Sequence, residues 1–405
     1  MTAAVPFDVD LGPLGFDDGG TVLLAHALRR AGLAVGAGVL VRGLGRDLGI
    51  HGRAWCRAKG HRFVEAAADG RGFSFVTGAH AQAQEIDAQR AGHRDARRPG
   101  AVAATASPHW GLAARGALVE AGTRPVHFAL DQRDLVWADE APALYAQAAA
   151  AQWDPATAIP WDAPITHDAV VEDAIVQVMT YLVENETVAL LVPARFLAQI
   201  HPHFREVLAV LAIQIADEAR HIEVFTRRAG LLREDMGSSS AGGQASLQTL
   251  LEEPDFALAM FLLSVLGEGS FLSLLWFLHE HAPDPVTRAV VRLAAQDEAR
   301  HVAFGLAHLG RHLSLEPELR ERLTAAVHRR HDALAHTAGL NADVFDALVV
   351  IAAGSLDPAA IGRGFAAVSE LALDMDRGRQ RRLLRLGFGG AEATALSELH
   401  TRNFM

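Results

Sequence analysis

The chain has 405 residues, half of them hydrophobic and 21% charged, with a formal net charge of −11. This length predicts more than one domain, and the acidic balance, without long runs of one sign, argues against nucleic acid or an anionic membrane as the main partner. The single cysteine, Cys56, excludes an internal disulfide. Together with the absence of a signal-like segment at the start of the sequence, it predicts a cytoplasmic protein.

Residues 1–78 predict a small α/β domain. "PFDVDLG" and "AVGAGVLVRGLG" are typical of strands, and each is followed by a helical pattern, "TVLLAHALRRAG" and "IHGRAWCRAKG". "HRFVEAA" and "GFSFVTG", joined by an Asp-Gly turn, indicate a hairpin. The predicted order is βαβαββ. Residues 79–139, which begin with a stretch rich in Ala, Gln, Gly, Arg and Pro, are predicted to be a linker and irregular cover.

Residues 140–405 predict a helical domain. Long helical patterns cover about 167–199, 203–230, 254–281 and 284–312, and the prolines between them predict two αα-hairpins. "MGSSSAGGQAS" (Met236–Ser246) predicts a flexible connection, and further helices are expected after residue 315. Phe256–Leu278 is long enough to span a bilayer, but Glu268 lies at its centre, so we expect a helix buried inside the protein and no membrane span.

One pentapeptide, Asp-Glu-Ala-Arg-His, occurs twice in the helical part of the sequence. It stands in "IADEARHIEVF" (Ile215–Phe225) and again in "AQDEARHVAFG" (Ala295–Gly305). Side chains three residues apart share one face of a helix, so the Glu and His of each copy can converge on one object. The two pairs are Glu218 with His221 and Glu298 with His301.

A further glutamate precedes each copy, on the preceding helix. The segments "YLVENETVALL" and "VLGEGSFLSLL" align with each other, which pairs Glu184 with Glu268 and favours Glu184 over its neighbour Glu186. Four buried carboxylates are costly unless cations lie between them. The oxygen and nitrogen donors suit iron or manganese, in the arrangement of carboxylate-bridged dimetal helical bundles. We therefore expect one terminal Glu and one His for each metal and two bridging Glu, a ligand set of Glu184, Glu218, His221, Glu268, Glu298 and His301.

The residues beside the motif glutamates are also candidates for the site. A metal-bound His commonly donates its second N–H to a carboxylate. Asp217 and Asp297 are placed to serve the His of the opposite repeat, and Arg220 and Arg300 could neutralise these aspartates.

The doubled motif resembles the ferritin-like di-iron superfamily in its oxidase and oxygenase branch. The resemblance covers residue 140 to the end. It implies a mainly α protein, a ferritin-like four-helix bundle with additional helices, preceded by the small α/β domain. It also implies two iron ions, with a manganese–iron pair as the alternative, O2 as co-substrate, a small organic substrate, an external electron donor and a homodimer. Phe225 stands where a radical-storing Tyr lies in small ribonucleotide reductase subunits, and Tyr181, Phe225 and Phe304 are candidates to line the substrate pocket.

The first 78 residues resemble small sulfur-carrier proteins of the TusA/SirA type. That family carries sulfur on a Cys in a Cys-Pro turn, whereas the turn here reads "LGFDDGG" (Leu14–Gly20), with Asp in its place. We therefore expect a docking or structural module with Cys56 as a buried thiol. Two other functions remain open for the whole chain: iron storage or peroxide scavenging, and a metal-stabilised module that recruits a sulfur-transfer partner.

Overall fold

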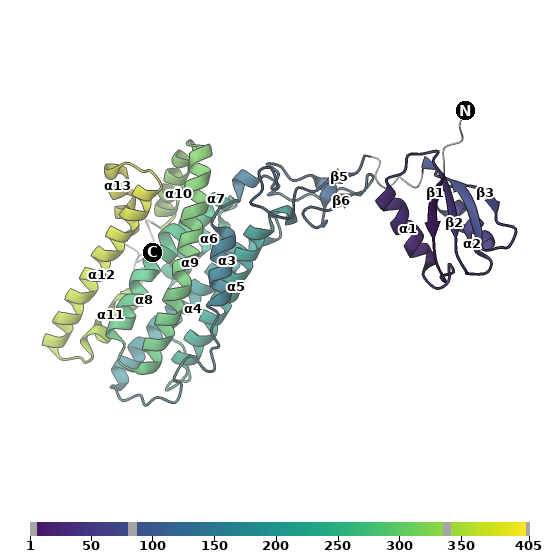
Figure 1. Cartoon of the computed structure of the whole chain (residues 1–405). Helices are drawn as coiled ribbons and strands as arrows, with labels where there is room; N and C mark the ends of the chain where they lie inside the picture. Colours follow the sequence, from purple (N-terminus) through teal and green to yellow (C-terminus); the bar gives the residue numbers. More distant parts are fainter. Residues whose placement is uncertain (1–5, 80–86, 335–341, 402–405) are drawn as a thin grey trace. The chain divides into compact units, whose positions relative to one another are not determined.

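The computed structural model describes residues 6–79, 87–334 and 342–401. The chain divides into two compact units (Figure 1), one formed by Met1–Ala101 with Ala113–Pro125 and the other by Val102–Leu112 with Val126–Met405. The segment predicted to be a linker, 79–139, is thus shared between the two units.

The first unit contains a four-stranded sheet and two helices in the predicted order βαβαββ. Strands β1 and β2 pair in parallel, the other neighbours are antiparallel, and the sheet order is β1-β2-β4-β3. One core joins both helices to the sheet through Leu24, Leu48 and Cys56, each 0% exposed. The elements are β1 (Phe7–Asp10), α1 (Gly20–Ala31), β2 (Gly38–Arg42), α2 (Leu48–Ala58), β3 (Arg62–Ala66) and β4 (Gly72–Val76).

The irregular segment after this sheet has short elements that the sequence did not predict. Two strands of two residues form a second, antiparallel sheet. The elements are β5 (Gln89–Arg90), η2 (Pro108–Trp110), β6 (Leu118–Val119) and η3 (Arg133–Leu135).

The second unit is built around two helical hairpins (Figure 1). Helix α4 packs along α5, α8 packs along α9, and α5 contacts α9 across the bundle. Asp284 begins α9 by accepting a hydrogen bond from the backbone N–H of Thr287, with Pro285 at the first helical position. The elements of the bundle are α4 (Ala169–Leu197), η4 (Pro202–Phe204), α5 (Arg205–Ala229), α7 (Phe256–Met260), η5 (Phe261–Glu268), α8 (Gly269–His281) and α9 (Pro285–Leu315).

The helix from Phe256 to His281 is interrupted by a π-helix. Element η5 has π geometry and ends at Glu268. A π-helix bonds i→i+5, so it shifts the faces on which later side chains point relative to an uninterrupted α-helix, and π segments occur often at functional sites. Glu268, one of the predicted metal ligands, is the last residue of this π-helix, so the shift changes the direction in which its side chain points.

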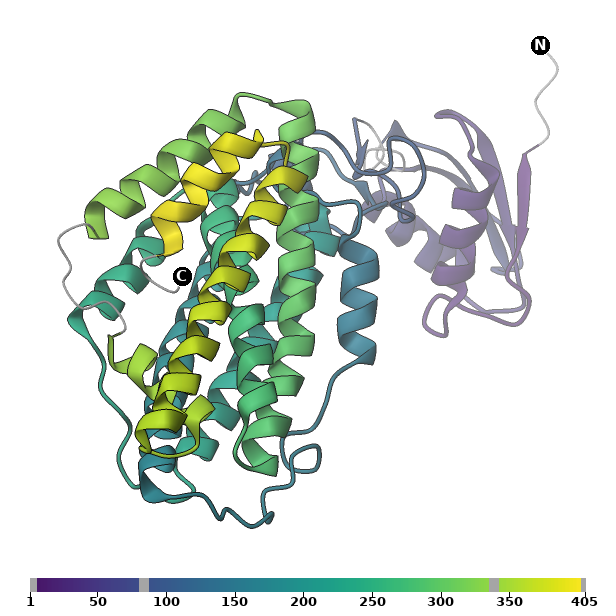
Figure 2. The ribbon, with the colours of Figure 1, turned by 90° about the vertical axis from the view of Figure 1, so that its left-hand side faces the viewer.

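Further helices cover the bundle. Helix α3 packs on α5 and α9, α11 packs on α4, and α12 lies along α8 (Figure 2). Helix α6 begins at Ala241, inside the stretch predicted to be a flexible connection, because Ser240 accepts a hydrogen bond from the backbone N–H of Gly243 and so caps it. These helices are α3 (Ala141–Ala150), α6 (Ala241–Glu252), α10 (Leu319–Leu334), α11 (Ala342–Ala353), α12 (Pro358–Arg385) and α13 (Gly390–Thr401).

Two helices, Ala169–Leu197 and Phe256–His281, are long and apolar enough to cross a membrane by length and composition alone. A third span would arise if the bent pair α11 and α12 were counted as one. In the structure, 67% and 83% of the most apolar windows of these two helices are buried, and the two helices form part of the bundle core.

A buried ion network joins three helices at one end of the bundle. Both terminal nitrogens of Arg228 donate to the carboxylate of Glu172, at 2.8 and 2.9 Å, and Nη2 also reaches Asp284 at 2.9 Å. Arg228 Nε donates to Thr287 at 2.7 Å, and a ring nitrogen of His167 lies 2.7 Å from Glu172. Because Arg228 is 0% exposed, this network links α4, α5 and α9 without solvent screening.

Replacement of Arg228 tests this link. We expect Arg228→Ala to reduce the free energy of unfolding of the helical unit by about 3–5 kcal/mol, because it leaves the buried carboxylates of Glu172 and Asp284 without their guanidinium partner. Urea unfolding followed by circular dichroism measures the change. Arg233→Ala breaks the exposed pair with Asp173 and is the control, with an expected loss of at most about 1 kcal/mol. Equal losses in the two variants would contradict a special role for the network.

Candidate metal centre

Four helical segments bring six acidic and imidazole side chains together in the middle of the bundle. Helix α4 supplies Glu186, η5 ends with Glu268, and α5 and α9 supply the two Glu-x-x-His pairs. All six side chains are at most 5% exposed. They are Glu186, Glu218, His221, Glu268, Glu298 and His301.

These side chains form two overlapping groups, each suited to one metal ion. Glu186 and His221 belong to one group, Glu268 and His301 to the other, and Glu218 and Glu298 to both, with the donor atoms of each group within 4.8 Å of one another.

The shared glutamates are positioned to bridge the two groups. Glu218 places one oxygen 3.2 Å from Nδ1 of His221 and the other 3.0 Å from Nδ1 of His301. Glu298 does the same, at 3.4 and 3.5 Å. Two carboxylates with one oxygen beside each imidazole provide the geometry of a bridged pair of metal sites.

Several donor atoms in this cluster lack a hydrogen-bond partner among the described residues. Buried polar atoms are nearly always paired, so a concentration of unpaired ones indicates that a ligand satisfies them. His301 Nδ1 is one of them, and its nearest carboxylate oxygen is Glu218 Oε1 at 3.0 Å. The unpaired atoms are Glu186 Oε1, Glu218 Oε1, Glu268 Oε2, both carboxylate oxygens of Glu298 and His301 Nδ1. Together with the oxygen-rich donor set, they fit two divalent ions of the iron and manganese kind.

The choice of Glu184 as the ligand from α4 is corrected by the structure, which places Glu186 in the cluster and Glu184 outside it. At about 100° per residue, the two side chains are roughly 200° apart around the helix, so only one can point into the bundle. The alignment of the repeats failed because it matched residue types out of phase with the buried faces. Phe271, Leu274 and Leu275, which follow Glu268 by three, six and seven residues, are buried, and so are the residues at the same spacing after Glu186, whereas those after Glu184 are not.

The aspartates beside the motif glutamates contact the histidines of the opposite repeat, the arrangement that the sequence predicts. Asp297 lies 3.2 Å from Nε2 of His221, and Asp217 lies 3.4 Å from Nε2 of His301. Hydrogen bonding at Nε2 leaves Nδ1 of each ring directed at the carboxylates and fixes the ring orientation.

Arginines hold the two aspartates in place. Arg220 Nη2 donates to Asp217 at 2.6 Å and to Asp297 at 2.7 Å, and thus joins the two repeats. Arg300 pairs with Asp297 and lies 4.0 Å from Asp217. Each aspartate is at most 1% exposed, so the arginines offset a desolvation cost that would otherwise destabilise the site.

Two residues of this outer network were not predicted from the sequence. Gln152 donates to Asp217 at 2.8 Å, and the indole N–H of Trp153 donates to Asp297 at 2.8 Å. The guanidinium of Arg220 stacks 4.5 Å above the Trp153 ring. Both residues follow α3 in the turn-rich stretch before α4, where local sequence carries no periodicity that would indicate a tertiary contact.

Electrostatics in the cluster favour bound protons when no cation is present. Burial would lower the pKa of His221 and His301, but the surrounding carboxylates raise both well above the usual value. Burial, reinforced by the neighbouring carboxylates, raises the pKa of Glu186 and Glu268 well above its usual range. Without metal ions, these four side chains therefore hold protons on groups that would otherwise coordinate the metal.

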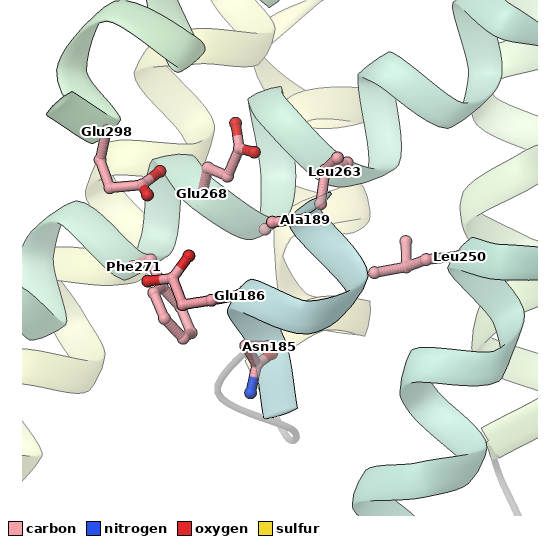
Figure 3. Close-up of a pocket in the computed structure, with 9 residues that line it drawn as sticks. Asn185, Glu186, Ala189, Leu250, Leu263, Glu268, Phe271 and Glu298 are labelled. Atoms are coloured by element: carbon pink, nitrogen blue, oxygen red, sulfur yellow. The ribbon is translucent and has the colours of Figure 1, made fainter. Parts of the chain in front are cut away.

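A cavity adjoins the centre on the side of the terminal glutamates (Figure 3). Three of the cluster's carboxylates line it, and the remaining wall is mostly apolar. The lining residues are Asn185, Glu186, Ala189, Leu250, Leu263, Gly267, Glu268, Phe271 and Glu298.

None of the three aromatic residues expected in the pocket is among those that line this cavity. Phe225 and Phe304 are 0% exposed and pack in the core beside His221 and His308, because they lie one turn beyond the motif histidines. Tyr181 packs its ring 5.8 Å from that of Phe271 and thus lies behind the cavity wall.

The fold and the donor set together define a ferritin-like dimetal four-helix bundle, in which two helices each supply a Glu and the other two each supply a Glu-x-x-His. No protein-family model matches the sequence, and no curated protein matches it.

Solved structures of helical oxidases do match the chain. A Synechococcus protein with aldehyde deformylating oxidase activity is 17% identical, with a TM-score of 0.39, over 56% of this chain and 96% of that one. An R2-like ligand-binding oxidase with an aerobically reconstituted metal cofactor is 15% identical, with a TM-score of 0.41, and the match covers 65% of this chain and 90% of that chain. The R2-like ligand-binding oxidase of Sulfolobus acidocaldarius is 16% identical, with a TM-score of 0.36, and the match covers 59% of this chain and 91% of that chain. At these scores no activity is transferred to this chain.

The ligand from α4 can be tested by a pair of variants. Glu186→Ala removes a donor from one group and should weaken binding of the ion in that group by at least about 10- to 100-fold. Loss of a residue that only hydrogen-bonds to a metal ligand already has an effect of this size, and Glu186 is itself a candidate ligand. Glu184→Ala, two residues away and outside the cluster, should retain both ions. Metal content of the purified proteins distinguishes the two, and equal metal loss in both variants would contradict the assignment.

Metal binding should also release protons. Because the pKa of His221, His301, Glu186 and Glu268 is raised, protons must leave before these groups can coordinate, and the apparent affinity should fall as pH falls. Anaerobic calorimetric titration with Mn(II), in buffers of different ionisation enthalpy, measures the protons released. A binding enthalpy that is independent of the buffer would contradict this prediction.

Proposed function

We propose that the protein is an O2-dependent di-iron oxidoreductase that oxidises a small organic substrate, by hydroxylation or desaturation at carbon or by oxygenation at nitrogen. The observation that carries this proposal is the bridged set of six buried donors, beside which lies a small cavity that three of the carboxylates line. The cavity, of about 20 Å³, has room for about one molecule of the size of water, as the open position of a catalytic metal site requires.

The two sides of the centre differ in how many hydrogen bonds hold their side chains, and this supports the proposal. On the histidine side, His221 and His301 are held through Asp297 and Asp217 by hydrogen bonds. On the cavity side, Glu268 accepts one hydrogen bond, from Gln214 at 3.1 Å, and keeps its other oxygen unpaired among the described residues. Glu268 therefore keeps an oxygen available for a ligand on the side of the cavity.

The protein contributes position and exclusion of water. Ala189, Leu250, Leu263 and Phe271 are each at most 5% exposed and make the wall apolar, so the space beside the donors is separated from bulk solvent. The iron pair, when bound, supplies the ability to reduce O2 and oxidise the substrate, with further electrons from an external donor.

We also propose that the first unit is a docking or structural module without sulfur-transfer activity of its own. Its one thiol, Cys56, is 0% exposed, and burial raises its pKa to about 12, so the reactive thiolate is scarce at neutral pH. This supports a role in packing for Cys56.

The test of the enzymatic function is a reaction of the iron-loaded protein with O2. Anaerobically reduced wild-type protein should hold about two irons per chain, consume O2 and develop a transient near-visible absorption. Glu218→Ala removes a bridging ligand and should abolish both responses, whereas Glu184→Ala should preserve them. A properly folded wild-type protein that binds no iron would contradict the proposal.

Product analysis separates this function from iron storage. Candidate substrates are compared by mass spectrometry for O2-dependent gain of oxygen or loss of hydrogen. Uptake of many irons per chain, with O2 consumption that no organic compound alters, would indicate a storage or scavenging role.

A further inference from the structure

The π-helix η5, which ends at Glu268, leaves one backbone carbonyl without its α-helical donor. In an α-helix, the N–H of Gly269 would donate to the carbonyl of Val265, four residues earlier. Here this N–H reaches the carbonyl oxygen of Ser264, five residues earlier, and those of Leu266 and Gly267, but not that of Val265. The carbonyl of Val265 therefore needs a donor from another part of the chain.

The side chain of Arg382 supplies this donor. Arg382 lies on α12, and its Nε donates to the carbonyl oxygen of Val265 at 2.6 Å. Burial, together with the nearby Arg379 and Arg381, lowers the pKa of Arg382 to about 9, so the guanidinium keeps its charge at neutral pH. A charged donor makes a stronger hydrogen bond than a neutral one, so this contact is suited to hold the carbonyl that the π-helix leaves free.

Two glycines leave room for the guanidinium of Arg382. A Cβ atom at Gly269 would overlap Nε and Cζ of Arg382, and a Cβ at Gly378, one turn earlier on α12, would lie 3.1 Å from Nη1. Gly269 has φ −60° and ψ −31°, which are ordinary helical values that any residue adopts. Its missing side chain therefore provides space, and a side chain at this position would displace the guanidinium from Val265.

Helix α9 approaches the same π-helix closely. A Cβ atom at Gly305, one turn after His301, would lie 2.6 Å from the Cβ of Ser264, so the two backbones are nearly in contact there. Two neighbours thus fix the π-helix: α9 through close packing, and α12 through one charged hydrogen bond.

The direction of the Glu268 side chain depends on this π-helix. A return to α-helical bonding would turn the residues that follow by about 100°, the angle of one residue. Such a turn would withdraw Glu268 from the group that it forms with Glu218, Glu298 and His301. The other group, which contains Glu186, takes no residue from η5, so the effect would fall on one of the two ion sites.

We propose that Arg382 is a positioning residue of the metal centre, which stabilises the π-helix through the carbonyl of Val265 and so holds Glu268 in place as a ligand of one ion. Arg382 acts through the backbone and is not itself a ligand. This inference goes beyond the proposed function, because it concerns the assembly of the centre and holds for any reaction that the bound ions perform.

Anaerobic binding of Mn(II) to the full-length protein tests the proposal. Calorimetry should show about two ions per wild-type chain. Arg382→Met should weaken one of the two ions by at least about tenfold and leave the other bound. Electron paramagnetic resonance provides a second readout: the signal of two coupled Mn(II) ions in the wild type should give way to that of a mononuclear Mn(II) ion in the variant.

Two further variants separate positioning from a general loss of stability. Gly269→Ala keeps the arginine but displaces its guanidinium, so it should reproduce the selective loss of one ion. It also keeps the test valid if Arg382→Met fails to fold. Arg381→Met is the matched control, because it removes the same charge from the adjacent, exposed residue, and it should bind two ions as the wild type does.

Hydrogen exchange of the metal-free protein tests the π-helix directly. Backbone amides of residues 261–270 should exchange faster in Arg382→Met and in Gly269→Ala than in the wild type, whereas those of α4 should be unchanged. Unchanged exchange of residues 261–270 in both variants would overturn the proposal.

The metal-binding results distinguish this proposal from the two on which the article's other conclusions depend. The proposal is overturned if Arg382→Met and Gly269→Ala both bind two ions as the wild type does, or if both variants lose the two ions to the same extent. A wild-type protein that binds no Mn(II) overturns the metal centre itself. Two tightly bound ions without any reaction of the iron-loaded protein with O2 overturn only the oxidative function.

Discussion

The convergence of four glutamates inside one bundle is the constraint on which the helical unit depends. Buried carboxylates without cations would cost more free energy than a domain's marginal stability can absorb. The inner glutamates are arranged so that two divalent ions can neutralise them, and the outer pair, Asp217 and Asp297, is neutralised by Arg220 and Arg300. Metal binding and the docking of helices are thus parts of the same energetic balance.

The two sides of the centre have different surroundings. Charged hydrogen bonds surround the histidines, whereas an apolar cavity adjoins the terminal glutamates. Hydrogen bonds fix the orientation of the imidazoles on one side of the site, and on the other side the carboxylates adjoin open space.

The helical hairpins and five of the six clustered ligands could be predicted from the sequence, because the repeated pentapeptide and its i,i+3 spacing are local properties. The sixth ligand, Glu186, was not chosen correctly, because the alignment matched residue types and not the buried face of the helix, which Glu186 shares with Ala189 and Val192. Gln152 and Trp153 could not be found either. Their roles depend on the distant helices that pack against them, and single side chains beside a turn carry no periodic pattern.

The exchange of aspartates between the repeats has a consequence for the order of assembly. Each hairpin holds the imidazole of the other, so neither can prepare a complete ion site by itself. A nascent chain with only its first hairpin folded offers incoming ions an incomplete and poorly oriented donor set. Metal binding is therefore expected to follow the packing of the two hairpins against each other. Bound ions would then stabilise only chains in which both hairpins have packed in the correct register.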